Sequence, residues 1–229
     1  MKVELVAYTP SPDDVCARGA GTCVNGGIPA EGRETALRRA LESGHESVAE
    51  HAVFTFAVEG ISRACSHQLV RHRLASYSQQ SQRYVDMDDF GYVTPESIAE
   101  NKKKSLRIDG TPVMMTMQEV YDDLMEEIGL VYRMLTASGV PEEDARYVLP
   151  NACATNIMIT MNARELRHMA EERMCSRAQW EIRELVSEMI RLAKEKAPVL
   201  FEDAGPKCIR LGYCPEERSC GRTPRRGER

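Results

Sequence analysis

One short segment concentrates side chains that can bind an anion. Arg71, His72 and Arg73 are contiguous, Ser81 follows after seven further residues, and Arg83 lies two beyond it. Arginine offers a planar, permanently charged fork that matches phosphate and carboxylate groups. The whole chain carries a formal net charge of −5, so these cations are a local feature and not part of a general polycation. The segment therefore predicts a site that holds a small anionic ligand at several points.

The elements around this segment must position its charges. The pattern over residues 61–73 predicts a helix, which would place Gln68, Arg71 and His72 on one face and turn Arg73 elsewhere. A short strand is predicted over residues 82–86. The alternative interpretation is a solvated helix end, because basic residues are favoured at helix C-termini in any case.

A second cluster lies at residues 162–173. This stretch is predicted to be a helix that follows a strand, with Asn162 as N-cap and Glu165 completing a capping box. Arg164 and His168 would share a face, and Arg173 would lie in the last turn. A helix N-terminus presents unpaired N–H groups, so a phosphate or an electron-rich ring edge could bind there. A capped surface helix with scattered charges is the alternative.

A metal site is not predicted. Two histidines, His45 and His51, flank two glutamates, but their spacing does not match the His-Glu-x-x-His pattern of zinc enzymes. This polar loop is better explained as part of a ligand pocket. The tail cysteines Cys208, Cys214 and Cys220 form no C-x-x-C pair and supply only three sulfurs, so free thiols are expected.

The overall pattern predicts an α+β fold with a mostly antiparallel sheet. A single domain is expected over residues 1–204, followed by a Cys/Arg-rich tail over residues 205–229 that is partly disordered. Residues 19–32, with five glycines, are predicted to be a loop. Strands are predicted at 3–8, 52–58, 82–86 and 154–161, and helices after Ser11 and at 34–43, 61–73, 116–138, 141–148, 162–173 and 179–196.

Composition narrows the class of protein. The chain has 229 residues, of which 42% are hydrophobic, which is ordinary for a soluble globular protein. No apolar run reaches the length of a membrane span and no secretory signal is visible, so we expect a cytoplasmic protein. G-x-G-x-x-G, Walker A and G-x-S-x-G motifs are missing from the sequence, which argues against a dinucleotide fold, a P-loop and a hydrolase serine.

These motifs together resemble the flavin-dependent thymidylate synthases. The family signature, Arg-His-Arg, seven residues, Ser and a nearby Arg, is complete here as Arg71-His72-Arg73, Ser81 and Arg83. Further segments agree in order and spacing, and the resemblance extends over residues 34–200. The first of these segments comprises residues 44–47, 50–51 and 54–56. The others are residues 145–150, residues 162–166 followed by Arg173, and residues 178–181.

The resemblance implies a reaction, cofactors and partners. It implies reductive methylation of dUMP to dTMP, with methylenetetrahydrofolate as carbon donor and FADH2, recharged by NADPH, as hydride donor. No protein nucleophile is required, because reduced flavin and folate carry these steps. It also implies a homotetramer with active sites shared between subunits, and no nucleic-acid or membrane partner.

The family pattern also implies site residues. Arg173 would stabilise the ionised uracil N3 and so activate dUMP, and His45 would support folate or flavin handling. Residues expected to bind FAD are Ser47, Arg71, His72, Arg73, Gln79, Asn162, Arg164 and His168. Residues expected to bind dUMP are Gln68, Arg71, Gln79, Gln80, Ser81, Gln82, Arg83, Arg146 and Arg173.

Two other classes of protein could use some of the same residues. A nucleic-acid-binding module could use the same arginines, but the acidic net charge and the lack of a basic or aromatic stripe argue against it. A phosphate-binding regulatory protein could keep the fold and lose activity, although the intact set of Arg71, Ser81, Arg83 and Arg173 speaks against this.

Overall fold

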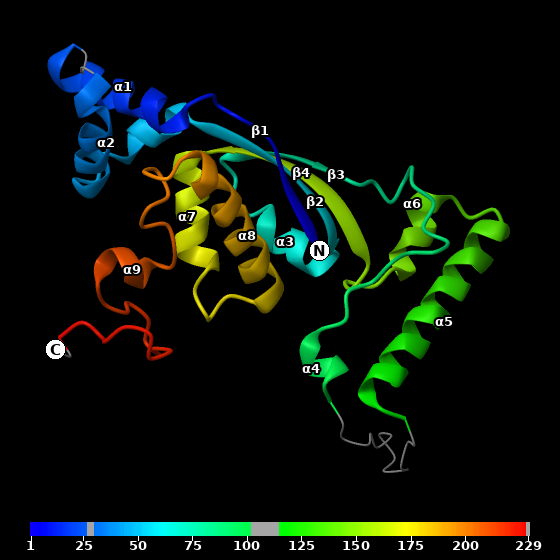
Figure 1. Ribbon diagram of the computed structural model, residues 1–229. Coiled ribbons are helices and arrows are strands. Elements are labelled where there is room, and N and C mark those ends of the chain that lie inside the picture. Colours follow the sequence, from blue (N-terminus) through cyan, green and yellow to red (C-terminus); the bar gives the residue numbers. More distant parts are fainter. Residues whose placement is uncertain (27–29, 102–114, 228–229) are drawn as a thin grey trace. The chain divides into compact units, whose positions relative to one another are not determined.

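The computed structural model describes residues 1–26, 30–101 and 115–227 and has an α+β architecture (Figure 1). A four-stranded sheet has the order β1-β2-β4-β3, and β1 pairs with β2 in antiparallel register, Val3 opposite Val58. The predicted α+β class and its mostly antiparallel sheet are confirmed. The strands are β1 (Lys2–Tyr8), β2 (Val53–Ser62), β3 (Ala75–Gln79) and β4 (Ala154–Asn162).

Helices make up most of the remaining regular structure. The longest, α5, begins with a complete capping box between Thr116 and Glu119. The α-helices are α1 (Pro12–Asn25), α2 (Arg33–Glu42), α3 (Arg63–Leu69), α4 (Glu96–Ala99), α5 (Met117–Ala137), α6 (Glu142–Ala145), α7 (Ala163–Arg173), α8 (Trp180–Lys196) and α9 (Lys207–Leu211). The 3-10 helices are η1 (Ala30–Gly32), η2 (Glu46–His51) and η3 (Arg146–Val148).

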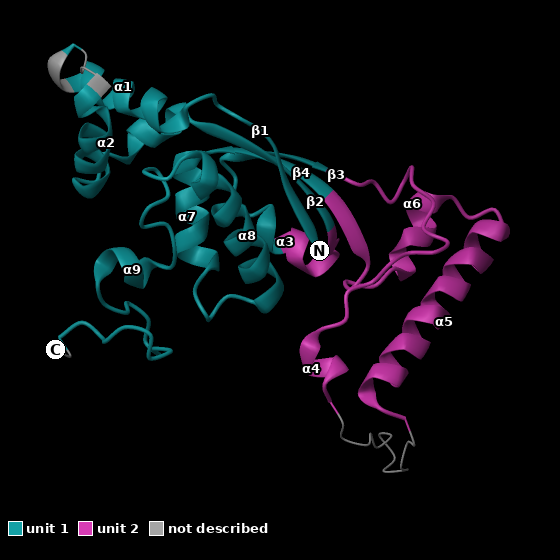
Figure 2. Cartoon of the chain, viewed as in Figure 1, with its two compact units in different colours: residues 1–59, 68–78, 157–229 teal, residues 60–67, 79–156 magenta. Residues whose placement is uncertain are grey.

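The chain divides into two compact units (Figure 2). Unit 1 holds residues 1–59, 68–78 and 157–229, and its core forms between the sheet and α7 with α8 (Figure 1). Alternating side chains of β2, Phe54 and Phe56, are fully buried, as is Ile159 of β4. This period of two is what a sheet with one buried face requires. The other face of these strands exposes apolar side chains such as Val53 and Met158.

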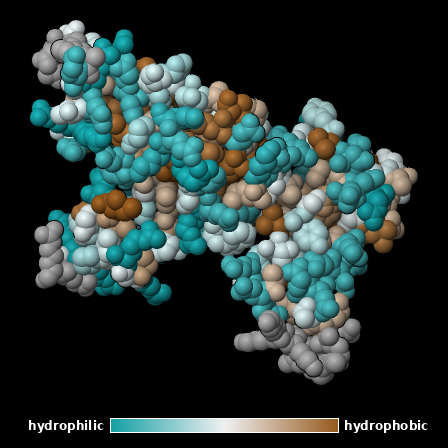
Figure 3. All heavy atoms as spheres, viewed as in Figure 1, coloured by the Kyte–Doolittle hydropathy of each residue, from teal (hydrophilic) through white to brown (hydrophobic). Residues whose placement is uncertain are grey.

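Unit 2 holds residues 60–67 and 79–156 and has its own small core. One face of α5 packs Met125 and Tyr132 against Met87 and Phe90. Surface hydropathy is mixed, with hydrophobic residues grouped over the region where Figure 1 draws the strands (Figure 3). No helix in the described ranges combines the length and the apolar character needed to cross a membrane.

The predicted loop over residues 19–32 is wrong for its first part, because α1 continues to Asn25. The burial of α1 side chains, including Cys16 and Ala20, stabilises this helix by more than its glycines destabilise it. Gly19 is required for close packing, since a Cβ there would lie 2.9 Å from the His51 ring. Residues 27–29 of this predicted loop lie outside the described residues.

Ser11 precedes α1 as predicted, but its side chain makes no capping hydrogen bond. Ser11 itself adopts a left-handed conformation, with φ 48°. An acidic residue of the first turn of α1 binds a distant part of the chain. Asp13 accepts hydrogen bonds from the backbone N–H groups of Val199 and Leu200, at 3.0 Å each.

The predictions between residues 61 and 86 need the largest correction. Helix α3 ends at Leu69, so Arg71 and His72 lie in the turn beyond it and do not share a helical face with Gln68. The strand is β3 at 75–79, and the predicted strand at 82–86 is instead a turn. The Ser81 hydroxyl accepts from the Arg83 N–H at 3.1 Å, which favours a turn over an extended strand.

The remaining elements follow the prediction within a few residues. The strands at 3–8, 52–58 and 154–161 and the helices at 34–43, 116–138, 162–173 and 179–196 are confirmed. Residues 141–148 form two short helices, α6 and η3. The segment between Asp88 and α5 contains the short helix α4, and residues 102–114 lie outside the described residues. In the tail, α9 and the residues up to 227 are described.

Candidate functional site

The centre of the site in unit 1 is a hydrogen-bonded chain of three residues, in which His72 and Glu165 are buried and Arg173 is half-buried. Arg173 Nε donates to His72 Nε2 at 3.1 Å, and His72 Nδ1 lies 3.3 Å from Glu165 Oε1. His72 and Glu165 are each only 6% exposed. Because Nε2 accepts from Arg173, the proton of a neutral imidazole must be on Nδ1, from which it is donated to the carboxylate. The chain therefore holds the guanidinium in a defined orientation.

The pKa of His72 is lowered from its ordinary value. Burial is the largest cause and the Arg173 cation the next, while the Glu165 carboxylate acts in the opposite direction. The neutral ring is therefore the form that the fold favours, in agreement with the tautomer that the hydrogen bonds require. A protonated His72 would lose its acceptor for Arg173 and set two cations against each other.

Local structure explains how His72 reaches this position. The turn after α3 is tied down by Tyr77, whose hydroxyl donates to the carbonyls of Leu69 at 3.0 Å and His72 at 2.9 Å. Burial, followed by Glu165, raises the pKa of Tyr77 to about 12, so the hydroxyl keeps its proton and remains a donor. The sequence marks Tyr77 only as a neutral donor between the charged residues, and its contact with the helix end was not predicted because no spacing rule connects the two.

The helix that carries Glu165 and Arg173 begins as predicted at Asn162. Asn162 Oδ1 accepts from the Glu165 N–H at 2.9 Å. The reciprocal half of the predicted capping box is replaced, because the Glu165 carboxylate instead contacts His72. Sequence reasoning had assigned Glu165 to the cap alone. Its apolar neighbours in the helix were the only signal that this carboxylate is buried.

Other predicted residues surround this chain in unit 1. The His168 ring lies edge-on to the His72 ring, with centroids 6.0 Å apart. Arg71 and Arg73 are exposed, and neither forms an ion pair within the described residues. They are therefore open to an anionic ligand. Gln68 is half-buried in α3.

Arg164 shares a helix face with His168, as predicted, but it is already paired. It forms an ion pair with Glu50 and lies 4.0 Å from Glu46, both in η2. The hydrogen bond that Arg164 donates to the Glu50 carboxylate is the main cause of the raised pKa of Arg164. His45 and Ser47, at the start of η2, are exposed. The polar loop predicted around His45 is thus brought to the N-terminal turn of α7.

Unit 2 contains a second group of predicted residues. Arg83 Nη2 lies 2.8 Å from the Glu143 carboxylate, and Arg146 Nε donates to the Glu143 carbonyl at 3.0 Å. Both arginines therefore meet at one residue of α6. A carboxylate held by an arginine resembles a phosphate oxygen in charge and geometry. Glu143 was not singled out by sequence reasoning.

The segment between β3 and Arg83 is held by short contacts within unit 2. Gln79 Nε2 donates to Ser66 Oγ at 2.9 Å and to Thr155 Oγ1 at 3.3 Å, and the Gln80 N–H donates to the Asn156 carbonyl. Gln82 Nε2 donates to Cys153 Sγ at 3.6 Å. Burial raises the pKa of the Cys153 thiol, which disfavours the thiolate that a nucleophile needs.

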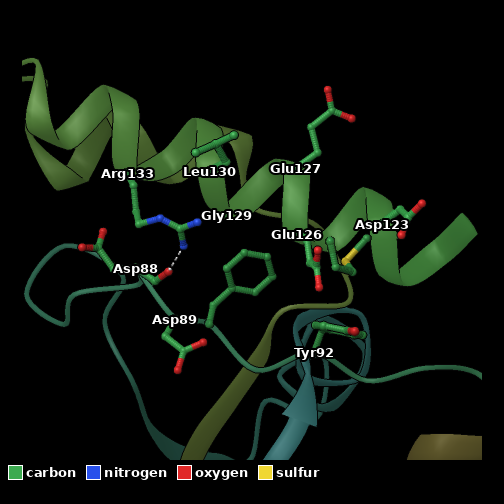
Figure 4. A pocket seen from close by; sticks show the side chains of 11 residues that line it. Asp88, Asp89, Tyr92, Asp123, Glu126, Glu127, Gly129, Leu130 and Arg133 are labelled. Carbon is green, nitrogen blue, oxygen red and sulfur yellow. Dashed lines mark hydrogen bonds between the residues drawn. The ribbon is translucent and has the colours of Figure 1, made fainter. Parts of the chain in front are cut away.

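A cavity of about 480 Å³ in unit 2 lies apart from all the predicted residues (Figure 4). Five carboxylates line it, among them Asp88, Asp89 and Glu126, together with the single cation Arg133. Arg133 Nη1 donates to the Asp88 carbonyl at 2.8 Å (Figure 4). This negatively charged lining disfavours a phosphate ligand, so the volume of this cavity is no reason to place the predicted anion site in it. Among the described residues, no His, Cys, Asp or Glu group is arranged to hold a metal.

Comparison with known proteins now decides the family. The family model for the Thymidylate synthase complementing protein matches residues 4–199. This chain belongs to that family. It is 46% identical to the flavin-dependent thymidylate synthase of Geobacter sulfurreducens, over 97% of this chain and 94% of the relative. It is 45% identical to that of Nitratidesulfovibrio vulgaris over 98% and 96% of the two chains, and 46% identical to that of Thermococcus onnurineus over 80% and 73%.

Proposed function

We propose that this protein is a flavin-dependent thymidylate synthase, an enzyme that methylates dUMP to give dTMP. The observation that carries the proposal is the Glu165–His72–Arg173 chain, which fixes a cation inside a member of this family. The names of the relatives support the reaction.

Arg173 activates the substrate in this proposal. Its Nε is used by His72, which leaves the two terminal nitrogens of the guanidinium to bind the uracil edge at N3. Methylation of the ring requires that negative charge develop on the pyrimidine, and a preorganised cation stabilises that charge. His72 and Glu165 are positioning residues, because they act through Arg173. His45 supports folate or flavin handling.

FAD fits the donor set in unit 1. Arg71 and Arg73 are exposed cations, and Asn162 with the first turn of α7 offers a helix N-terminus, which together suit a pyrophosphate. The further residues proposed to hold FAD are Ser47, His72, Gln79, Arg164 and His168. When bound, FAD supplies the hydride. Arg164 must exchange Glu50 for the cofactor, since the two are paired here.

The dUMP phosphate is assigned to the arginines of unit 2. Glu143 holds Arg83 and Arg146 in place, and its carboxylate stands where an anionic ligand would bind Arg83. Phosphate would therefore compete with Glu143 for this guanidinium. The remaining residues proposed to bind dUMP are Gln68, Arg71, Gln79, Gln80, Ser81 and Gln82.

No protein nucleophile is included in the proposal. Methylenetetrahydrofolate supplies the carbon and NADPH recharges the flavin. The raised pKa of Cys153 and the engagement of Ser81 Oγ by the Arg83 N–H support this choice. Neither residue has a general base beside it in the described contacts.

We further propose a cytoplasmic homotetramer with shared active sites and no nucleic-acid or membrane partner. The exposed apolar side chains on one face of the sheet, including Val6, Val53 and Met158, support an interface between copies of the chain. The synthase domain is proposed to span residues 1–204, with 205–229 as an appended tail. The family match over residues 4–199 supports this boundary.

The visible absorbance spectrum of freshly purified protein tests the function first. We expect an oxidised-flavin spectrum that NADPH and dUMP bleach without oxygen, and dTMP formation once methylenetetrahydrofolate is added. A protein that cannot be loaded with FAD would contradict the synthase proposal. A loaded protein that binds dUMP without forming dTMP would point instead to the regulatory phosphate-binding alternative.

A further inference from the structure

Four cysteines line one small cavity in unit 1, outside the proposed active site. The cavity has a volume of about 40 Å³ and is formed by the loop after α7, the start of α9 and the tail. Three of the cysteines, Cys208, Cys214 and Cys220, are those of the tail, and Cys175 is added by the loop. All four are free thiols. Sequence spacing could not reveal this grouping, because Cys175 lies far from the tail in the chain.

Cys220 has the environment of a reactive thiol. It is exposed, whereas Cys208 is buried. A hydrogen bond with the Ser176 side chain is the largest cause of a lowered pKa for Cys220, followed by the Arg222 backbone. Low thiol pKa, exposure and a neighbouring second thiol are the features of cysteines that react with oxidants. Ser176 is the residue next to Cys175, so its contact with Cys220 brings these two cysteines to the same spot.

We infer that Cys220 and Cys175 form a reversible thiol–disulfide pair that reacts with peroxides. In the first step the Cys220 thiolate attacks an oxygen of hydrogen peroxide, which breaks the O–O bond and gives a sulfenic acid and hydroxide. The hydroxide takes up the proton that the thiol released on ionisation and becomes water. The Cys175 thiol then attacks the sulfenic sulfur, forms the S–S bond and releases a second water. Hydrogen peroxide is reduced by two electrons while the two cysteines are oxidised to the disulfide. Two equivalents of a small-molecule thiol then reduce the disulfide to the two cysteines and are themselves oxidised to a disulfide.

The cluster is joined to the part of α7 that carries Arg173. Lys207 forms an ion pair with Glu172, and Arg210 Nη2 donates to Glu171 at 3.2 Å. A disulfide to Cys175 would therefore add a covalent link to a tail already held against the last turn of this helix. The family match ends at residue 199, so Cys220 and the rest of the tail lie beyond it, whereas Cys175 lies within it. An effect on dTMP formation would rest on the proposed function, but disulfide formation itself does not.

A metal site built from the same sulfurs is the competing possibility. Among the described residues, however, no set of three or more metal-binding side chains is arranged around a common point. Cys175 and Cys220 need only approach each other, which is a smaller demand than tetrahedral coordination.

Intact-mass and peptide analysis of the full-length flavoprotein tests this inference. The protein is reduced, desalted without oxygen and treated briefly with hydrogen peroxide. We expect loss of two hydrogens and a Cys175–Cys220 peptide, with Cys220 reacting roughly tenfold faster than the exposed Cys23. A Cys175→Ser variant should instead accumulate sulfenic acid on Cys220, detectable with a dimedone probe. The matched control, Cys23→Ser, should behave as the parent protein does.

Three outcomes would overturn the inference. They are oxidation of Cys220 no faster than that of Cys23, a disulfide between a different pair, and a tightly retained zinc ion that protects the four thiols. FAD content and dTMP formation, measured on the same reduced sample, report on the proposed function independently. A protein that makes dTMP but forms no Cys175–Cys220 bond would refute only the redox pair.

Discussion

The two groups of predicted ligands differ in how they are held. In unit 1, His72 and Glu165 are each 6% exposed and orient Arg173 through hydrogen bonds. In unit 2, the Arg83 and Glu143 side chains are 49% and 50% exposed and form a surface ion pair. Exposed pairs contribute little stability and exchange partners readily, whereas a buried polar chain fixes geometry. In the function we propose, this difference would suit unit 1 to orienting the cation Arg173 and unit 2 to binding an anion that can be released.

The largest expected effect comes from removing the oriented cation. Replacing Arg173 by Ala should lower kcat for dTMP formation by about 100- to 1,000-fold, which is typical for the loss of one preorganised charge-stabilising group. FAD should stay bound, which the visible spectrum checks. Arg177→Ala, a change to an exposed arginine beyond the same helix, serves as control. Near-normal turnover in the Arg173 variant would remove its assigned role.

The second-largest effect on turnover should come from changing Glu165, the carboxylate that contacts His72. Glu165→Gln keeps the size of the side chain but removes the charge that faces His72, and we expect kcat to fall about tenfold with KM for dUMP little changed. Glu184→Gln, on the exposed part of α8, is the matched control. If KM for dUMP rose while kcat stayed constant, Glu165 would belong to binding and not to positioning.

The lowered pKa of His72 predicts how stability depends on pH. A histidine whose pKa is lower in the folded than in the unfolded protein binds fewer protons when folded. Its contribution to the free energy of unfolding is therefore complete above the unfolded pKa of about 6.5. It is lost as the pH falls from there towards the folded pKa. Thermal unfolding of His72→Gln should therefore vary less with pH in this range than that of the parent protein. Parallel curves for the two proteins would show that His72 does not titrate in this window.

The smallest effect is expected in unit 2. Glu143→Gln removes the carboxylate that competes with phosphate for Arg83, so KM for dUMP should fall by up to about fivefold, which corresponds to the roughly 1 kcal/mol of an exposed pair. The turnover number should be unchanged. Glu142→Gln, at the adjacent exposed position, controls for net charge. A rise in KM would mean that Glu143 helps to position Arg83 for the ligand.

Sequence reasoning singled out several residues that the structure brings together, but it did not predict their arrangement. The Arg-His-Arg motif and Arg173 were singled out, but a helix through residue 73 would have kept Arg71 and His72 on the face of Gln68. The helix instead ends at Leu69, and the Tyr77 hydroxyl donates to the Leu69 and His72 carbonyls at this end, a contact that no local pattern encodes. For the same reason the partnership of Glu165 with His72, 93 residues apart, was not predictable.

The account is tested most directly by a double-mutant cycle between Glu165 and Arg173. The rate of dTMP formation is measured for Glu165→Gln, Arg173→Lys and the double variant, each loaded with FAD. If Glu165 acts through Arg173, the double variant should be about as slow as Arg173→Lys alone, because residues that work as a unit are not additive. If the two losses in rate simply multiply, the buried chain does not orient Arg173.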